Sequence, residues 1–198
     1  MTRSRMHEFR VPALLGALLL VAAALSLSVG SAPVPVLGGL HDWFAGRVSA
    51  AAMIIGEIRL PRTLLALAVG ASLGLAGAAL QGLLRNPLAD PGLTGASQGA
   101  ALGAAAVFYF GLFPGAGEIA PALAGLVGGG LALLGMLALA GAARPSQVIL
   151  AGLAISTLSG AALATVLNFA PNPYAMQELV FWLLGSVAER GLKPLWIL

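Results

Sequence analysis

The sequence contains no cysteine, one lysine and two histidines. Without cysteine, the chain can form no disulfide, no thiolate zinc site and no iron–sulfur cluster. The lysine, Lys193, is followed by proline and is not preceded by glycine, so the sequence has no phosphate-binding loop, and any ATP must be hydrolysed by another chain. His7 and His41 have no partners at ligand spacing, which leaves no metal site.

Charge is also scarce, because 9% of the 198 residues are charged and 59% are hydrophobic, with a mean hydropathy of +0.97. Ordinary soluble domains contain roughly 25% charged residues, so this composition indicates a membrane protein. The net charge of +3 is spread along the chain without a basic run that could follow phosphates, which argues against a nucleic-acid partner.

Long stretches without Asp, Glu, Lys or Arg divide the chain, and a helix needs ~20 apolar residues to cross a bilayer. The pattern predicts an all-α fold, a polytopic transmembrane helix bundle forming one permease domain over residues 1–198. The predicted spans lie near 11–30, 63–84, 93–113, 120–141 and 147–168, with an interfacial helix near 175–185 and the start of a sixth span at 194–198. Because the chain ends where a span begins, we expect it to be a fragment.

The first apolar run fits a retained helix better than a cleaved signal peptide, because it is longer than a typical signal core. Arg3, Arg5 and Arg10 precede it and predict a cytoplasmic N-terminus. Alternation of the spans then places residues 31–62 outside and the turn after the second span inside. Counted over all loops, basic residues divide evenly between the two sides, so the orientation depends on the first helix alone.

Small residues recur every four positions in several spans, a spacing that lets helix backbones approach closely in lipid. We expect these residues to pack helices against one another. The glycines of the second and third spans in this pattern are Gly70, Gly74, Gly82, Gly95, Gly99 and Gly103.

The segment GASQG, residues 95–99, matches the pattern of a serine nucleophile. Such a nucleophile needs a strand-turn-helix context and a nearby histidine base, and neither is available. We therefore interpret Ser97 as a small packing residue and expect no enzyme activity in this chain.

The segment RLPR, residues 59–62, places two arginines on one face at the start of the second span, with Pro61 suited to a first helical turn. Cations there oppose the helix macrodipole, and on the outside they also oppose the positive-inside bias. From the residues alone, two interpretations stay open. Arg59 and Arg62 either snorkel to lipid headgroups or form a charged socket for an acidic partner.

The segment LLRNPLADPG, residues 83–92, predicts a defined turn between two spans. A cation is favourable where the second span ends, a proline stops the helix, and Asp before Pro is typical of an N-cap and first turn. We expect Gln81 to bond to a neighbouring helix. The predicted turn residues are Arg85, Asn86, Pro87, Asp90 and Pro91.

Residues 59–103 resemble the signature region of the FecCD-type permeases, the membrane subunits of ABC importers for iron-siderophore, haem and cobalamin. The ordered run is RLPR, Gly-Ala, Gly, Gln, Asn-Pro-Leu-Ala-x-Pro and Gly-x-Ser-x-Gly-Ala. VILAGLAIS at 148–156 and FWLLGSV at 181–187 resemble later segments in the same order, so the likeness covers nearly the whole chain.

The resemblance implies a transport subunit in a bacterial inner membrane, with a second permease subunit, two ABC ATPase subunits that hold ATP, and an extracytoplasmic substrate-binding protein. It implies that Arg59 and Arg62 meet glutamates of that binding protein. It further nominates a pathway face at Ser156, Thr157 and Gly160, and a cytoplasmic gate near the loop residues Pro145 and Ser146.

Family members are roughly twice as long, with about ten spans of ~20 residues each. Two other classes stay open: a secondary transporter, which usually has ionisable residues within its spans, and a purely structural membrane partner, which would leave RLPR unexplained. Iron-siderophore is the substrate expected from family frequency.

Overall fold

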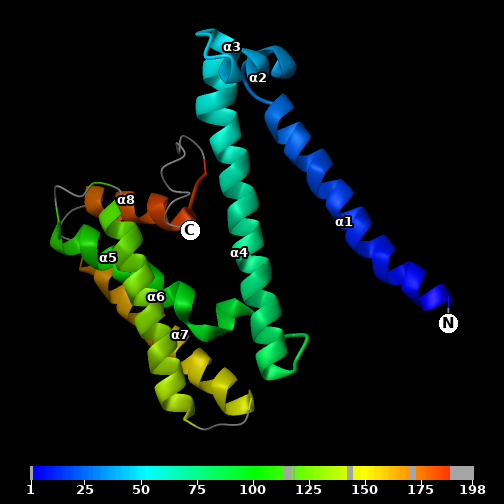
Figure 1. Ribbon diagram of the computed structural model, residues 1–198. Helices are drawn as coiled ribbons and strands as arrows, with labels where there is room; N and C mark the ends of the chain where they lie inside the picture. The colour runs from blue at the N-terminus through cyan, green and yellow to red at the C-terminus, as the bar shows by residue number, and fades with distance from the viewer. Residues whose placement is uncertain (1, 114–116, 118, 142–144, 170–172, 188–198) are drawn as a thin grey trace. The chain divides into compact units, whose positions relative to one another are not determined.

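The structure is a computed structural model that describes residues 2–113, 117, 119–141, 145–169 and 173–187 (Figure 1). Its regular elements are helices, and the described residues contain no strand, so the predicted all-α fold is confirmed. The start of the sixth span at 194–198 lies outside the described residues. By its internal contacts the chain divides into unit 1, Met1–Ser72 with Val187–Leu198, and unit 2, Leu73–Ser186.

Unit 1 contains α1 (Thr2–Ser28), α2 (Val36–Phe44) and a longer run that begins with α3 (Ala50–Met53). That run continues without a break through the π-helical segment η1 (Ile54–Arg59) into α4 (Leu60–Leu84). The second span was predicted to begin near residue 63, with residues 31–62 outside, but the helix begins already at Ala50. The hydroxyl of Ser49 caps it by accepting a bond of 3.1 Å from the Ala52 amide.

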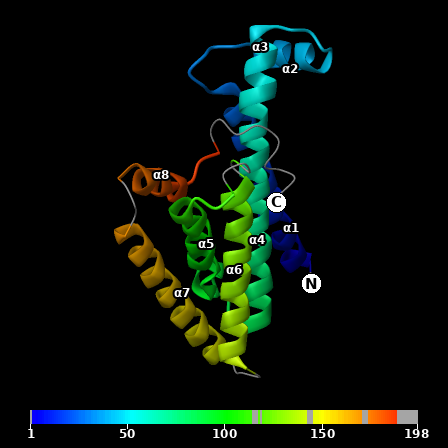
Figure 2. The same cartoon turned by 90° about the vertical axis from the view of Figure 1, so that its left-hand side faces the viewer.

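Unit 2 contains the second half of α4, the short 3₁₀ turn η2 (Pro91–Thr94) and four further helices. α5 packs against both α6 and α7, and α8 packs against α5 (Figure 2). The bounds of these helices are Ala96–Phe110 for α5, Ile119–Ala140 for α6, Pro145–Asn168 for α7 and Pro173–Leu184 for α8.

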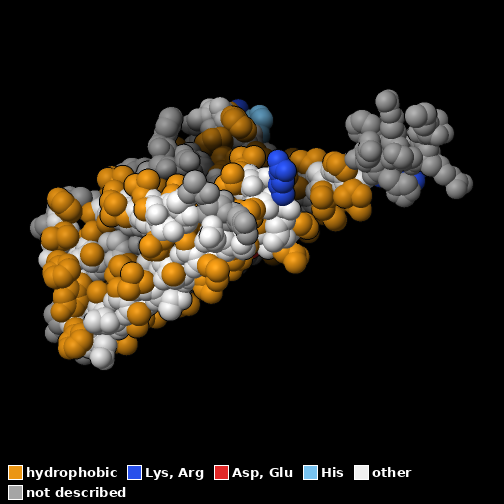
Figure 3. Space-filling view, turned by 90° about the horizontal axis from the view of Figure 1, so that it is seen from below, with side chains coloured by type: hydrophobic (Ala, Val, Ile, Leu, Met, Phe, Trp, Pro, Cys, Tyr) orange, Lys and Arg blue, Asp and Glu red, His pale blue; other side chains and the backbone are white. Residues whose placement is uncertain are grey.

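Within the described residues, four helices are long and apolar enough to cross a membrane: Arg10–Ser28 within α1, the run Ala50–Leu84, α6 and α7. α5 has 15 residues, fewer than the ~20 that a full crossing needs, because η2 takes the first residues of the stretch predicted as the third span. Hydrophobic side chains cover much of the described surface, as one face shows (Figure 3). An exposed apolar surface of this kind suits a lipid environment.

Several glycines of unit 2 lie where two helices approach closely. A Cβ built on Gly103 of α5 would lie 2.2 Å from the backbone oxygen of Ala124 in α6, and one on Gly99 would lie 2.6 Å from that of Gly128. A Cβ on Gly152 of α7 would lie 2.3 Å from the backbone oxygen of Leu93 in η2. Real Cβ atoms do not approach backbone so closely, so α5, α6 and α7 need glycine at these contacts.

The glycines of α4 have different surroundings. Around Gly70, Gly74 and Gly82, no atom of another described element lies within 4 Å of the position that a Cβ would take. Their packing role therefore stays a prediction.

Candidate functional site

The two arginines of RLPR have opposite surroundings although three residues separate them. Arg59 ends η1 and is 6% exposed, whereas Arg62, in the first turn of α4, is exposed. Pro61 between them is fully buried. The helix therefore directs one guanidinium into unit 1 and leaves the other on its surface.

The Arg59 guanidinium binds the end of α1 and the segment after it. Its Nη1 donates to the backbone oxygens of Leu27 at 2.8 Å and Ser28 at 3.1 Å, and its Nη2 donates to that of Ala32. Gly30 lies directly against this group, since a Cβ there would be 2.7 Å from Nη2. The side chain therefore fills a pocket that the backbone of residues 27–32 forms around it.

The end of α1 is a favourable place for a cation, whereas Arg59 lies beyond the first turn of the continuous helix that begins at Ala50, where the macrodipole of its own helix has little effect. The last carbonyls of a helix have no partner within the helix and carry a partial negative charge of about half an elementary charge. In α1, the Val29 amide satisfies the Leu25 oxygen at 2.8 Å, and Arg59 satisfies those of Leu27 and Ser28. Hydrogen bonds from a charged donor contribute roughly 1.5–3 kcal/mol each, which offsets part of the cost of burying the cation.

Thr63, one turn after Arg59, adds a second link between the same helices. Its side chain is 5% exposed, its hydroxyl donates to the Arg59 backbone oxygen at 2.8 Å, and its Oγ1 lies 2.8 Å from the Ser26 hydroxyl of α1. Arg59 and Thr63 together bind the end of α1 to η1 and the start of α4. We call this set of contacts, made by Ser26, Leu27, Ser28, Ala32, Arg59 and Thr63, the α1 clasp.

Arg62 takes no part in the α1 clasp, and within the described residues it has no hydrogen bond or ion pair. Its guanidinium is therefore available to a group from outside unit 1. The docking role predicted for Arg59 and Arg62 stays a prediction, but the geometry leaves only Arg62 of the two with a free cation.

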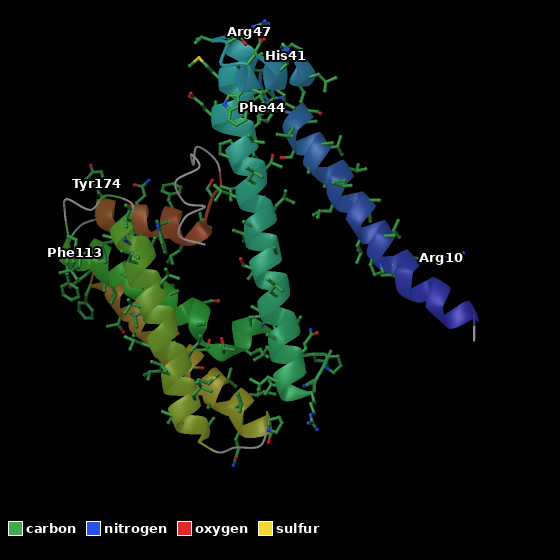
Figure 4. The ribbon with its side chains drawn as sticks, in the orientation of Figure 1. Arg10, His41, Phe44, Arg47, Phe113 and Tyr174 are labelled. Carbon is green, nitrogen blue, oxygen red and sulfur yellow. The ribbon has the colours of Figure 1, made fainter. Side chains whose placement is uncertain are left out.

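α2 covers η1 at the same end of unit 1. A Cβ on Gly56 would lie 2.2 Å from the Trp43 ring, so the indole rests directly on the π-helical backbone. His41, Phe44 and Arg47 lie on α2 and the turn after it (Figure 4). Arg47 is exposed and pairs with Asp42 at 3.8 Å, so a second arginine near this end already has an acidic neighbour.

The turn after α4 is built by the polar residues that the sequence singled out. Arg85 is exposed and has φ +48°, directly after the last residue of α4. The Asn86 side chain accepts from the Leu88 amide at 2.9 Å, and Asp90 caps η2 by accepting from the Gly92 amide at 2.6 Å, with Pro91 as first residue. Pro87 lies exposed between them.

Gln81 bonds to this turn and not to a neighbouring helix, because its amide donates to the Ala89 backbone oxygen at 3.5 Å. A small apolar cavity lies behind the turn, and its lining includes Leu84, Met136 and Ile149. The Arg85 side chain is exposed and does not line this cavity.

The predicted pathway residues lie on α7. Ser156 is half-buried, and its backbone nitrogen would be 2.9 Å from a Cβ on Gly95, which adopts φ +79° where η2 meets α5. Thr157 is exposed and donates its hydroxyl to the Leu153 oxygen of its own helix at 2.8 Å. Gly160 borders open space. Their pathway role stays a prediction.

Pro145 and Ser146 were expected in a loop but form the first turn of α7, where both are exposed. Proline suits this position, because the first helical residues need no N–H donor. The part of the chain that the structure describes contains no group of acidic or histidine side chains that could hold a metal ion.

A comparison with protein families gives a match over residues 18–198 to the FecCD transport family. The chain belongs to this family. The match includes RLPR, the turn at Arg85–Pro91 and the α7 segment.

Curated relatives of this FecCD chain are permeases. It is 40% identical over 195 positions to the ferric enterobactin transport system permease protein FepD of Escherichia coli (strain K12), and this alignment covers 93% of this chain and 55% of FepD. It is 35% identical over 189 positions to the vitamin B12 import system permease protein BtuC of Citrobacter koseri, and this alignment covers 93% of this chain and 54% of BtuC. The chain spans about half the length of the curated relatives it matches.

A solved structure shares the fold of the FecCD chain. A metal-chelate type ABC transporter in an inward-facing conformation superposes with a TM-score of 0.73 at 28% identity, covering 92% of this chain and 53% of that one.

Of the FecCD chain's α1 clasp, sequence reasoning found Arg59 and missed the other members, including Ser26 and Thr63, together with Gly30 against it. Thr63 follows RLPR directly, so its position one turn after Arg59 was a usable signal. Ser26 carried no such signal, because its partner Thr63 lies 37 positions further along the chain. Gly30 carried none either, because its contact with Arg59 is also distant in the sequence.

Proposed function

We propose that this chain acts as the membrane-spanning permease subunit of an ATP-driven ABC importer for an iron-siderophore or a related metal chelate such as haem or cobalamin. The observation that carries the proposal is the FecCD match over residues 18–198. The names of the relatives, a ferric enterobactin permease and a vitamin B12 permease, supply the substrate class.

In this proposal the chain is not an enzyme and binds no cofactor. A separate ATPase subunit binds and hydrolyses ATP, and a second permease subunit completes the pathway. The substrate crosses by alternating access along the α7 face of Ser156, Thr157 and Gly160, with Pro145 and Ser146 near the cytoplasmic gate. The protein lies in the bacterial cytoplasmic membrane, and the arginines at positions 3, 5 and 10 favour a cytoplasmic N-terminus.

The end of unit 1 that holds Arg62 then faces outward, where an extracytoplasmic binding protein delivers the substrate. An exposed guanidinium without an acidic neighbour attracts a carboxylate and can bind it through two parallel hydrogen bonds. We therefore propose Arg62 as the residue that meets an acidic side chain of the binding protein.

The test measures binding of the substrate-binding protein encoded beside the permease gene to the assembled permease in nanodiscs. Arg62→Glu is expected to weaken binding at least tenfold, because it places like charges across the interface. Arg47→Glu is the matched control, since it makes the same charge change on a neighbouring exposed arginine, and we expect it to retain binding.

Equal losses from Arg47→Glu and Arg62→Glu would indicate a general charge effect and overturn the docking assignment. If the wild-type permease binds no such protein, the importer class itself is contradicted.

A further inference from the structure

Gln98 of α5 is a polar residue in an otherwise apolar part of unit 2, and two serines of α7 lie at the same level. We propose that Gln98, Ser156 and Ser159 form a polar patch on the transport pathway and hydrogen-bond the metal chelate as it passes. This inference rests on the proposed function and adds Gln98 and Ser159 to its pathway face. We call these three residues the α5–α7 patch.

Two contacts show how α5 and α7 lie side by side (Figure 2). At the start of α5, a Cβ on Gly95 would lie 2.9 Å from the backbone nitrogen of Ser156. Further along both helices, Ala105 and Leu163 belong to one buried cluster. Because the residue numbers rise together from one contact to the next, the two helices run in the same direction.

The α5–α7 patch lies between these two contacts. Residues four and seven positions apart share one face of a helix. Gln98 therefore lies on the face of α5 that holds Ala105, and Ser156 and Ser159 lie on the face of α7 that holds Leu163. Gln98 is exposed and both serines are half-buried, so the two faces carry polar groups that the buried cluster does not cover.

The side chains of the α5–α7 patch have no hydrogen bond to any described residue. Other hydroxyls on helices of this chain bond to a carbonyl of their own helix, as Ser72 does to Ala68 at 2.9 Å and Thr165 does to Ala161 at 2.8 Å. Among the described residues, no buried side-chain polar atom lacks a partner. The polar atoms of the α5–α7 patch must therefore reach the surface, where a group from outside unit 2 can bind them.

The depth of the α5–α7 patch argues against lipid as that group. α7 has 24 residues and is about 36 Å long, and Ser159 lies about 21 Å along it from Pro145. This position is near the middle of a hydrocarbon layer of ~30 Å. Lipid tails offer no hydrogen bond to an unsatisfied amide or hydroxyl, so water or a polar ligand is the favourable neighbour there.

The chemistry of the α5–α7 patch suits a large polar solute that must also leave. The Gln98 amide offers two donors and one accepting oxygen, and each serine offers a donor and an acceptor. The organic ligand of a metal chelate carries oxygen and nitrogen groups that can pair with them. The α5–α7 patch contains no charge, so it can guide a chelate through hydrogen bonds without the strong attraction of an ion pair.

The first experiment tests whether the α5–α7 patch faces water. Because the sequence has no cysteine, Gln98→Cys and Ser159→Cys each give this chain a single thiol in the assembled permease in nanodiscs. A cationic methanethiosulfonate reagent does not enter lipid and should modify both about tenfold faster than Leu131→Cys, an exposed apolar position near the middle of α6. Arg47→Cys, on the exposed turn after α2, is the positive control.

The second experiment measures uptake of ferric enterobactin and of vitamin B12, supplied in turn as probes, by the complete importer in proteoliposomes. Gln98→Leu should lower the maximal uptake rate about fivefold, because leucine has a similar size but forms no hydrogen bond. The KM for the loaded binding protein should stay unchanged, since that protein captures the chelate first. Gln98→Asn keeps the amide and should restore most of the rate. Gln177→Leu makes the same change at an exposed glutamine of α8 and is the control.

The outcomes separate this inference from the proposed function. Modification of Gln98→Cys and Ser159→Cys as slow as that of Leu131→Cys would show that lipid or another helix covers the α5–α7 patch, and would overturn the inference. Wild-type uptake by Gln98→Leu, or an equal loss in Gln177→Leu, would overturn it as well. Rapid modification of both cysteines in an importer that takes up neither probe would support a water-facing patch and contradict the proposed substrate class alone.

Discussion

In unit 2, helices approach closely at glycines, whereas in unit 1 the end of α1 is bound to η1 and α4 by polar side chains. At Gly99 and Gly103 the backbones of α5 and α6 touch with no room for a methyl group. At Arg59 and Thr63 the contacts are hydrogen bonds of 2.8–3.1 Å to groups of α1. The difference follows from where each contact lies along a helix.

The middle part of a helix has no free backbone groups. Two such parts therefore associate in lipid through close packing of small residues. The end of a helix has free carbonyls, and in a membrane an unsatisfied carbonyl costs several kcal/mol. A long cationic side chain is useful only at such an end. Glycine contacts therefore pack the middle parts of helices, whereas polar side chains satisfy the carbonyls at the end of a helix.

The largest effect is expected from breaking a glycine contact of unit 2. Gly103→Val forces α5 away from Ala124 of α6 and should destabilise the protein by about 3 kcal/mol. Thermal unfolding in detergent, followed by circular dichroism at helical wavelengths, measures the change. Gly130→Val is the control, because no atom of another described element lies within 4 Å of the position that a Cβ would take there. Equal shifts in both variants would show that valine is tolerated at the α5–α6 contact.

Removing a polar contact within unit 2 should lower the free energy of unfolding by a smaller amount. Asp90→Ala removes the cap of η2, which accepts from the Gly92 amide at 2.6 Å, and should cost about 1 kcal/mol. Asp90→Asn keeps an acceptor at the same place and should restore most of the stability in the same unfolding measurement. If alanine and asparagine behave alike, the cap contributes nothing and unit 2 depends on glycine contacts alone.

The smallest effect concerns the hydroxyl pair of the α1 clasp. A double-mutant cycle of Ser26→Ala and Thr63→Val should give a coupling of about 0.6 kcal/mol, the average for hydrogen bonds between transmembrane helices. Ser72→Ala serves as control, since its hydroxyl bonds only to Ala68 of its own helix at 2.9 Å. A coupling indistinguishable from zero would leave Arg59 as the only polar link that matters in the α1 clasp.

Much of the fold could be predicted from the sequence because its signals are local. Runs without charge predicted helices where α1, α4, α6 and α7 lie, and Asp90 before Pro91 predicted a capped turn that the structure contains. Proline geometry and side-chain caps act over one to three residues, so they can be read without knowing the fold.

The partner of Arg59 could not be read in the same way. The groups that bind it are backbone carbonyls, which every residue type provides, so Leu27 and Ala32 give no signal in the sequence. Arg59 is buried and Arg62 is exposed because α1 lies beside one face of the helix and not the other. The helical start at Ala50 was missed because the spans were predicted from stretches without charge, and the charges at 57, 59 and 62 lie before the stretch 63–84.

The π-helical turn η1 has a consequence for how this segment tolerates changes in length. A π turn holds one residue more than an α-helical path would use. Deleting one residue between Ile54 and Arg59 would therefore convert η1 to an α-helical turn and keep the parts before and after it at nearly the same rotation about the helix axis. η1 therefore accommodates one additional residue between the α2 contact at Gly56 and the α1 contact at Arg59, so this part of the continuous helix should tolerate a one-residue deletion better than the regular part of α4.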